Sequence, residues 1–239
     1  MILSHLKKST SPAIDGEVTI LIPTMFDSRF VIELCIKSIL KNTSYPTFNI
    51  IVADAGVDEE TGDYLKSLHE KSVIRFIKAK DWQRPKDDLA EAVTTKYYAI
   101  MHDDIYIKHK DWLSRRMRLM LADPSNAIVG SLVPNYKTNG KRFFPMGMLV
   151  RTEAARALDI KWGKQVEQGY DTGALAYIKF QQQNHYKFVS YKTTTDIHHF
   201  SSMTWPKYKD MNDPKIQKLL VERDIKLNMI REMLRTGNF

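Results

Sequence analysis

Short apolar runs alternate with amphipathic segments through the first half of the chain. The apolar runs are rich in β-branched and aromatic residues, which is typical of strands. Four such runs are expected as strands: residues 18–22, 48–53, 73–77 and 97–101. The segments between them predict helices at residues 30–41, 59–69 and 87–95. Strands that alternate with helices at this spacing indicate βαβ units and a parallel sheet.

The same kinds of pattern continue in the second half. Apolar runs predict strands at residues 127–134, 142–151 and 186–191, and helices are expected at residues 110–122, 152–158 and 173–184. From residue 213 onward, apolar positions recur at helical spacing in a basic segment. We find no internal repeat, low-complexity tract or clear linker. We therefore expect one domain over residues 17–205, with a leader at 1–16 and a helical extension at 206–239 packed on that domain.

The composition indicates a folded protein with a basic surface. Of the 239 residues, 43% are hydrophobic and 27% are charged, which excludes a disordered chain. The formal net charge of +8 favours an anionic partner, such as a nucleotide, a nucleic acid or an acidic membrane face. A single cysteine, Cys35, rules out an internal disulfide and is compatible with a reducing compartment. Neither a signal peptide nor a transmembrane segment is apparent, so we expect a cytoplasmic protein that can still contact a membrane peripherally.

The most informative stretch lies where the fourth predicted strand ends. There, an apolar run meets His102, Asp103 and Asp104. Adjacent carboxylates are costly to bury unless they are paired or bind a metal. At a strand end they are well placed to hold a divalent cation, which in turn can hold a diphosphate. The ordinary alternative is an Asp-rich turn after the strand.

Polar residues also follow the first two predicted strands. Pro23 and Thr24 follow the first, and Asp54 follows the second. Ligands of parallel α/β sheets bind outside the carboxyl ends of the strands, so we expect these residues at one binding edge. The chain lacks a Gly-x-Gly-x-x-Gly motif after its first strand and a phosphate-binding loop that ends in Lys-Ser or Lys-Thr. A metal held by aspartates is therefore the expected means of binding phosphate.

The order of these features resembles that of the GT-A glycosyltransferases, in particular the large inverting family 2, which includes many bacterial polysaccharide-building enzymes. The resemblance rests on collinear segments: residues 18–24, 35–40, 49–56, 101–104, 146–154, 169–171 and 198–199. It implies a single α/β GT-A domain, in which helices flank a central, mostly parallel sheet with a Rossmann-like nucleotide-binding half, and a basic C-terminal helix follows. It also implies that a hexosyl or pentosyl group moves from a nucleoside-diphosphate sugar to an acceptor hydroxyl, with inversion.

The resemblance assigns residues to the donor. Thr24 and Asp54, with Pro23 beside them, match positions that contact the nucleotide base and ribose. A carboxylate suits this role because it accepts hydrogen bonds from a base N–H or a ribose hydroxyl, although Asp54 could also be a simple β-turn residue. Arg84 and Lys86 lie in a basic loop that could neutralise the diphosphate or could simply be solvated.

A divalent metal, Mn²⁺ or Mg²⁺, is implied in the same way. Asp104 matches the metal-binding aspartate of the family's Asp-x-Asp motif, and Asp103 beside it is assigned to the donor site. The first Asp position of the motif holds His102, which could bind a transition metal such as Mn²⁺ or reach the ribose, and this departure weakens a specific claim for Mg²⁺. His198 or His199 matches the histidine that often completes the metal site. Adjacent residues of an extended chain point in opposite directions, so only one of the two should reach the metal.

The catalytic base implied by the resemblance is Asp171. In an inverting transfer a base deprotonates the acceptor hydroxyl on the side opposite the leaving nucleotide, and one carboxylate suffices. Glu167 is the rival for this role, and the ordinary alternative for Asp171 is a carboxylate that stabilises a helix N-terminus. Arg142 precedes a strand that is expected to line the acceptor side.

The acceptor is left open between two classes. The first is a growing glycan or lipid-linked saccharide at the inner membrane face, where the basic C-terminal helix would dock. The second is DNA that carries hydroxymethylated pyrimidines, with Arg115, Arg116 and Arg118 tracking phosphates and the target base flipped out. Trp205 and Tyr208 are candidates either to stack on a sugar or base or to pack the C-terminal helix.

A function from another class is a non-catalytic module that binds nucleotide or nucleic acid. His102 in the metal motif keeps this hypothesis open. The presence of both Asp104 and Asp171 argues against it.

Overall fold

The structure of the protein, a computed structural model, describes residues 18–26, 29–135, 140–163, 170–201, 203 and 213–239. The predicted leader, Glu167, Trp205 and Tyr208 lie outside these residues.

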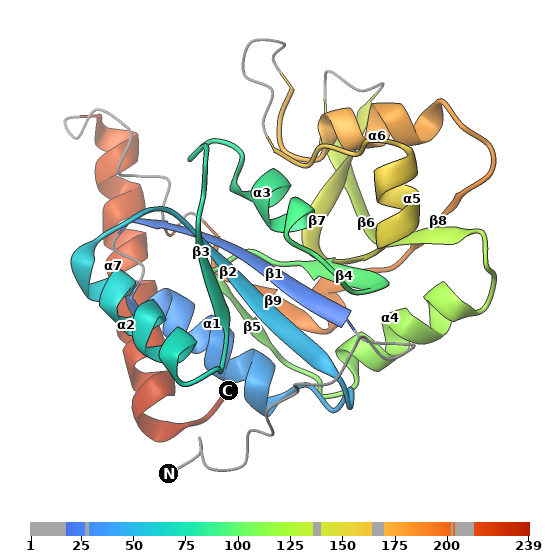
Figure 1. Cartoon of the computed structure of the whole chain (residues 1–239). Helices are drawn as coiled ribbons and strands as arrows, with labels where there is room; N and C mark the ends of the chain where they lie inside the picture. The colour runs from blue at the N-terminus through green and yellow to red at the C-terminus, as the bar shows by residue number, and fades with distance from the viewer. Residues whose placement is uncertain (1–17, 27–28, 136–139, 164–169, 202, 204–212) are drawn as a thin grey trace.

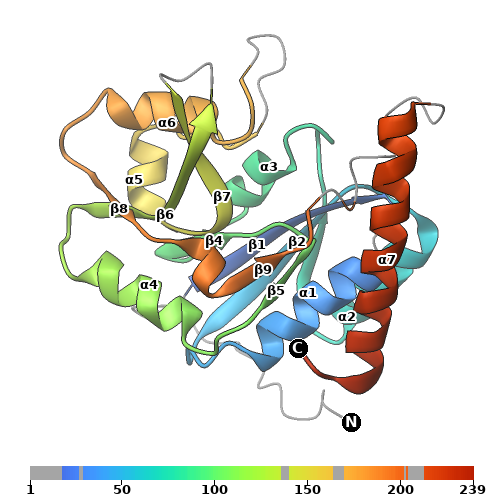
Figure 2. The same ribbon diagram turned by 180° about the vertical axis from the view of Figure 1, so that it is seen from behind.

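A seven-stranded mixed sheet forms the centre of the described fold (Figure 1). Its order is β3-β2-β1-β4-β7-β6-β8. Neighbours from β3 to β4 are parallel, β7 is antiparallel to both β4 and β6, and β6 is parallel to β8. The strands are β1 Val18–Phe26, β2 Phe48–Val57, β3 Arg75–Lys78, β4 Tyr97–Ile100, β6 Asn126–Asn135, β7 Gly140–Arg151 and β8 Lys187–Ser190. Two short strands, β5 (Ile105–Ile107) and β9 (Ile197–His199), form a separate antiparallel sheet (Figure 2).

Helices cover both faces of the sheet, so successive residues of a central strand enter different cores. Ile20 and Ile22 of β1 pack with α1, α2 and α4, whereas Leu21 packs on the other face with α3, α5 and α6 (Figure 1). This burial on both faces explains why the strands read as continuous apolar runs. The helices are α1 Arg29–Lys41, α2 Glu59–Glu70, α3 Pro85–Glu91, α4 Trp112–Leu121, α5 Thr152–Ala157, α6 Ala174–Gln181 and α7 Pro214–Thr236, with a 3₁₀ turn, η3, at Thr193–Thr195.

The predicted fold class is confirmed: a mixed α/β domain with a central, mostly parallel sheet flanked by helices and followed by a C-terminal helix. All seven predicted strands belong to the central sheet. The β5–β9 pair was not predicted, because strands of three residues carry too little pattern to be recognised. Helix α3 is shorter than expected and begins with Pro85, which suits the first turn of a helix.

One prediction about helix α4 is wrong. Arg116, expected to track DNA phosphates, is completely buried and pairs with Asp196. Arg115 also pairs with Asp196, so Arg118 is the exposed member of the three arginines. The reason is helical geometry: Arg116 follows Trp112 by four residues and shares its core-facing side of the helix.

Helix α7 lies against α1 (Figures 1 and 2). Ile230 packs in an apolar cluster with Val31 and Leu34 of α1. At the C-terminal end, Lys41 Nζ donates to the carbonyl of Gly237 at 2.5 Å. Helix α7 therefore packs on α1. Among the described residues, no helix combines the length and the apolar character needed to cross a membrane.

This packing generates a stability prediction that uses two isoleucines of one helix. Ile230 is 0% exposed and Ile225 is 57% exposed. Replacing Ile230 with alanine should lower the free energy of unfolding by about 3 kcal/mol, because the change leaves a cavity in the cluster. Ile225→Ala should change it by less than about 0.5 kcal/mol. Urea denaturation of both variants measures the difference, and equal effects would contradict the packing of α7 on α1.

Candidate active site at the carboxyl edge of the sheet

Three strands of the parallel half of the sheet end at one edge, where polar side chains gather. Thr24 of β1 lies opposite Asp54 of β2 in the strand register, and Pro23 precedes it. β4 runs beside β1 and leads directly into His102 and Asp103. Thr24 Oγ1 donates a hydrogen bond of 2.9 Å to Asp103 Oδ2 across this edge. The structure thus brings together the polar ends of β1, β2 and β4, as the parallel topology requires.

Asp103 and Asp104 are both buried, at 8% and 7% exposure. Burial and the neighbouring charge of Asp104 raise the pKa of Asp103, despite the hydrogen bond from Thr24. Burial is the largest influence and opposes ionisation of Asp104, but the hydrogen bond from His199 and the smaller effects of the neighbouring histidines and the backbone together outweigh it and hold the pKa of Asp104 below its ordinary value. Asp104 is therefore the member of the pair that stays ionised.

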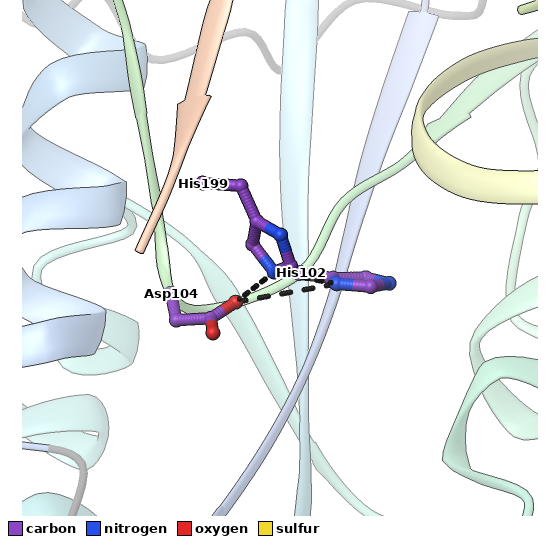
Figure 3. A group of neighbouring side chains, drawn as sticks. All are labelled: His102, Asp104 and His199. Carbon is purple, nitrogen blue, oxygen red and sulfur yellow. Dashed lines mark hydrogen bonds and ion pairs between the residues drawn. The ribbon is translucent and has the colours of Figure 1, made fainter. Parts of the chain in front are cut away.

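His102, Asp104 and His199 form a group able to hold one metal ion (Figure 3). One ligand atom from each lies within 4.8 Å of the others. His199 Nε2 is 2.9 Å from Asp104 Oδ1 and 3.3 Å from His102 Nδ1, and His102 Nδ1 is 4.0 Å from the same carboxylate oxygen. Figure 3 shows the three side chains pointing toward one another.

The chemistry of these residues fits a bound cation. Burial, reinforced by the positive charge of Lys86, lowers the pKa of His102 to about 3, so the imidazole is neutral near pH 7. Metal binding requires neutral imidazoles and an ionised carboxylate, the state in which His102 and Asp104 are found. The second ring nitrogen of His199 lies 3.0 Å from the Ser201 hydroxyl, which orients the ring. Two imidazoles with one carboxylate suit Mn²⁺ or a later transition metal better than Mg²⁺, which prefers oxygen ligands.

The two adjacent histidines have different surroundings. In the β5–β9 ladder, His199 pairs with Ile105, directly after Asp104. His198 is exposed, and its ring packs against Tyr106 and Phe200 at centroid distances of 5.0 and 4.9 Å. The structure therefore brings His199, and not His198, to Asp104.

Asp54 is held in a fixed orientation at the end of β2. Its Oδ1 accepts from the backbone N–H groups of Gly56 and Val57 at 2.7 and 2.9 Å, and its Oδ2 accepts from Lys78 Nζ at 2.8 Å. Burial opposes ionisation, but these hydrogen bonds, led by that from Lys78, lower the pKa of Asp54. The turn considered as the ordinary role of Asp54 is thus present. Because Oδ2 accepts one hydrogen bond from the described residues, a lone pair remains for a ligand.

The two basic residues at the start of α3, Arg84 just before the helix and Lys86 in its first turn, differ in their environments. Arg84 is half-exposed, and its Nε donates to Asp81 at 2.8 Å. Lys86 makes no hydrogen bond or ion pair with the described residues. Burial lowers the pKa of Lys86, while the negative charges of Asp103 and Asp171 oppose that effect. Lys86 therefore faces the acidic edge of the sheet.

Asp171 lies just before α6, and its charge acts on Lys86 together with that of Asp103. Its side chain is 47% exposed, and Oδ2 is 3.3 Å from Arg142 Nη2 of β7. Arg142 also donates from Nη1 to the carbonyl of Thr172 at 2.8 Å. The positive charge of Arg142 contributes to the lowered pKa of His102, after burial and Lys86. Arg142 is thus close to both Asp171 and the metal-binding group.

Sequence reasoning missed some contributors to this site. Phe144 of β7 meets both histidine rings edge-on, at centroid distances of 5.6 Å from His102 and 6.2 Å from His199. Nothing in the local sequence marks Phe144 for this contact, which depends on the β4–β7 pairing. Lys86 was considered together with Arg84 in one loop, and their different surroundings depend on packing that the local sequence does not show.

Comparison with known proteins supports the assignment of the fold. The sequence profile of glycosyl transferase family 2 matches residues 19–204. No curated protein matches the chain. The crystal structure of S. aureus TarS 1-349 superimposes with a TM-score of 0.56 at 13% identity, over 87% of this chain and 70% of that chain. TarS 1-349 in complex with UDP-GlcNAc gives a TM-score of 0.58 at 12% identity, over 87% and 71% of the two chains.

A further structure has different bound molecules. The mannosyltransferase PcManGT from Pyrobaculum calidifontis, in complex with GDP-Man and Mn²⁺, superimposes with a TM-score of 0.60 at 15% identity, over 86% of this chain and 64% of PcManGT. This chain spans only 43% of the longer TarS structure. At such identities the likeness establishes the fold alone. The family profile, however, covers most of the chain, so the resemblance drawn from the sequence is confirmed: the chain belongs to glycosyl transferase family 2.

Proposed function

We propose that the chain is a metal-dependent glycosyltransferase that moves a hexosyl or pentosyl group from a nucleoside-diphosphate sugar to an acceptor hydroxyl, with inversion at the anomeric carbon. The observation that carries the proposal is the convergence of His102, Asp104 and His199 at the sheet edge that also holds Thr24 and Asp54. TarS and PcManGT, which share the fold, were solved with UDP-GlcNAc and GDP-Man, and these complexes support a nucleotide-sugar donor. Inversion rests on the family resemblance.

His102, Asp104 and His199 are the proposed metal ligands, and Mn²⁺ is favoured over Mg²⁺ by the two imidazoles. A bound cation supplies positive charge that stabilises the phosphates of the departing nucleoside diphosphate. His198 is assigned no role in binding it, because its ring packs against Tyr106.

The donor is proposed to lie along the ends of β1, β2 and β4. Thr24 and Asp54, with Pro23, would contact the base and ribose, and Asp103, which accepts a hydrogen bond from Thr24, would face the same donor. Lys86 is assigned to the diphosphate, because it faces the acidic edge without an ion pair to the described residues. Arg84, placed at the diphosphate by the sequence, is given a lesser role because it pairs with Asp81.

Asp171 is the proposed general base. The acceptor oxygen forms a bond to the anomeric carbon, the bond from that carbon to the phosphate oxygen breaks, and the acceptor proton passes to a carboxylate oxygen of Asp171. Half-exposure leaves this carboxylate accessible to an acceptor from solvent, and Arg142 holds it in place.

For the acceptor, a glycan or lipid-linked saccharide is favoured over DNA. Three exposed apolar residues, Val221, Ile225 and Met229, lie one turn apart along α7, as in a helix that rests on a membrane surface. The DNA alternative loses support because Arg116 is buried and paired with Asp196, and so is not available for phosphates. A non-catalytic binding module would not need both the His102, Asp104 and His199 group and the Asp171 carboxylate, so this alternative is disfavoured.

The adjacent histidines provide a matched test of the metal site. His199→Ala should lower Mn²⁺ affinity and the release of nucleoside diphosphate at least about tenfold, because it removes a ligand. His198→Ala should leave both within about twofold. Calorimetric titration with Mn²⁺ and a diphosphate-release assay across a panel of nucleotide sugars measure these effects, and chelation followed by Mn²⁺ should abolish and restore release. Equal losses in the two variants would contradict the assignment of His199.

The two basic residues at the start of α3 allow a second comparison. Lys86→Gln should weaken nucleoside-diphosphate binding about tenfold, since it removes a charge that faces the phosphates. Arg84→Gln should have a smaller effect. Calorimetry at fixed Mn²⁺ gives both affinities, and a larger loss in Arg84→Gln would reverse the assignment.

Asp171 is tested by separating chemistry from binding. Asp171→Asn should reduce kcat about 10²- to 10⁴-fold while donor and Mn²⁺ affinities stay within about twofold, because the base acts on the acceptor. Glu167→Gln is the comparison for the rival base. Running the assay with lipid-linked saccharides in vesicles and with hydroxymethylated DNA identifies the acceptor class: stimulation by DNA alone would overturn the saccharide acceptor, and a larger loss in Glu167→Gln would overturn Asp171 as the base.

A further inference from the structure

A second buried group of charges lies at the end of the β5–β9 ladder opposite to the proposed metal ligands and has no part in the proposed reaction. At its centre is Asp196, which is 0% exposed and whose carboxylate accepts hydrogen bonds from three side chains. Arg116 Nη1 and Tyr191 Oη donate to Oδ2 at 2.8 and 2.7 Å, and Arg115 Nη1 donates to Oδ1 at 3.1 Å. The Asp196 carboxylate is therefore held from α4 and from the segment that follows β8.

Arg116 connects this group to the central sheet. Its Nε donates to the carbonyl of Gly147 in β7 at 2.7 Å, and its Nη1 also donates to the carbonyl of Trp112 at 2.8 Å. Gly147 has a φ of 64°, and a Cβ at this position would lie 2.3 Å from the side chain of Ile197. Glycine is therefore required where β7 approaches β9.

Asp196 also directly precedes β9, the strand that carries His199. The carbonyl of Asp196 accepts from the Lys108 N–H at 2.8 Å, and the Phe200 N–H donates to the carbonyl of Asp104 at 2.9 Å. These two backbone bonds lie at the two ends of the β5–β9 ladder. The position of β9 thus sets where His199 stands relative to Asp104.

A buried ion pair is an expensive way to gain stability alone. The desolvation of two charges can exceed their attraction, and apolar side chains of similar size often hold a fold equally well. The free-energy cost of burying this ion pair is higher here because Arg116 Nη2 has no hydrogen-bond partner among the described residues. Unlike apolar packing, a hydrogen-bonded ion pair is directional, so it fixes the position and orientation of the group that accepts the hydrogen bonds.

We propose that Asp196 is a positioning residue for the metal site, which anchors β9 to α4 and β7 so that the His199 imidazole stands beside Asp104. This inference rests on the proposed metal-binding role of His102, Asp104 and His199.

A pair of tyrosines tests the proposal without leaving a charge unpaired. Tyr191→Phe removes one hydrogen bond to Asp196, and Tyr98→Phe removes the hydrogen bond from Trp162 Nε1 to the Tyr98 hydroxyl, of 2.9 Å, in the core on the other face of the sheet. Tyr191→Phe should weaken Mn²⁺ binding about fivefold to tenfold and speed hydrogen exchange of the Phe200 amide by a similar factor. Tyr98→Phe should change neither, at a comparable loss of thermal stability.

A double variant separates positioning from stability. Arg116→Met with Asp196→Leu removes both buried charges, so the thermal midpoint should stay close to that of the unmodified protein. Mn²⁺ affinity should nevertheless fall at least about tenfold, because β9 loses its directed anchor. If Asp196 served stability alone, Mn²⁺ affinity would change only in parallel with the thermal midpoint, and the double variant would bind Mn²⁺ as the unmodified protein does.

These measurements distinguish a failure of the positioning role of Asp196 from a failure of the metal site. If the unmodified protein binds Mn²⁺ and both variants bind it as the Tyr98→Phe control does, the positioning role is overturned while the metal site stands. If the unmodified protein does not bind Mn²⁺, the metal site fails. In that case, an unchanged rate of hydrogen exchange at the Phe200 amide in Tyr191→Phe would also overturn the claim that Asp196 anchors β9. A faster rate would support that claim.

Discussion

Two adjacent carboxylates buried at the end of β4 are the constraint around which this protein is organised. Asp103 and Asp104 cannot both stay charged in a low-dielectric setting without partners. The fold supplies different partners to each: a hydroxyl from β1 to Asp103 and an imidazole from β9 to Asp104. The result is one carboxyl with a raised pKa beside one that stays ionised. The pair therefore presents one stable negative charge, that of Asp104, to a cation.

These partners come from distant parts of the chain. His102 and His199 are separated by nearly a hundred positions in the sequence, yet their ring nitrogens are 3.3 Å apart. The β5–β9 ladder makes this contact possible, because it lays the segment after Asp104 against the segment that carries His199. A sheet of two three-residue strands is too small to be stable by itself, so it depends on its surroundings. α1 and α4 pack against it, and Asp196 is fixed at its end.

The basic character of the chain is distributed in a way that the net charge of +8 does not reveal. Arg116 is inside the molecule and bonded to Asp196, while Lys86 and Arg142 face carboxylates at the proposed site. These three basic residues are therefore directed at carboxylates within the described structure rather than gathered on one exposed surface.

The sequence by itself determined the alternation of strands and helices, because residues buried on both faces of a parallel sheet must be apolar without interruption. It also placed Thr24, Asp54 and Asp104 at one edge, since parallel strands end together. It could not choose between His198 and His199, predict the burial of Arg116, or separate Lys86 from Arg84. Those outcomes depend on which element packs against the residue: β5 beside His199, the core beneath α4, and the acidic edge facing α3. Contacts between segments far apart in the chain decide such questions, and local pattern does not encode them.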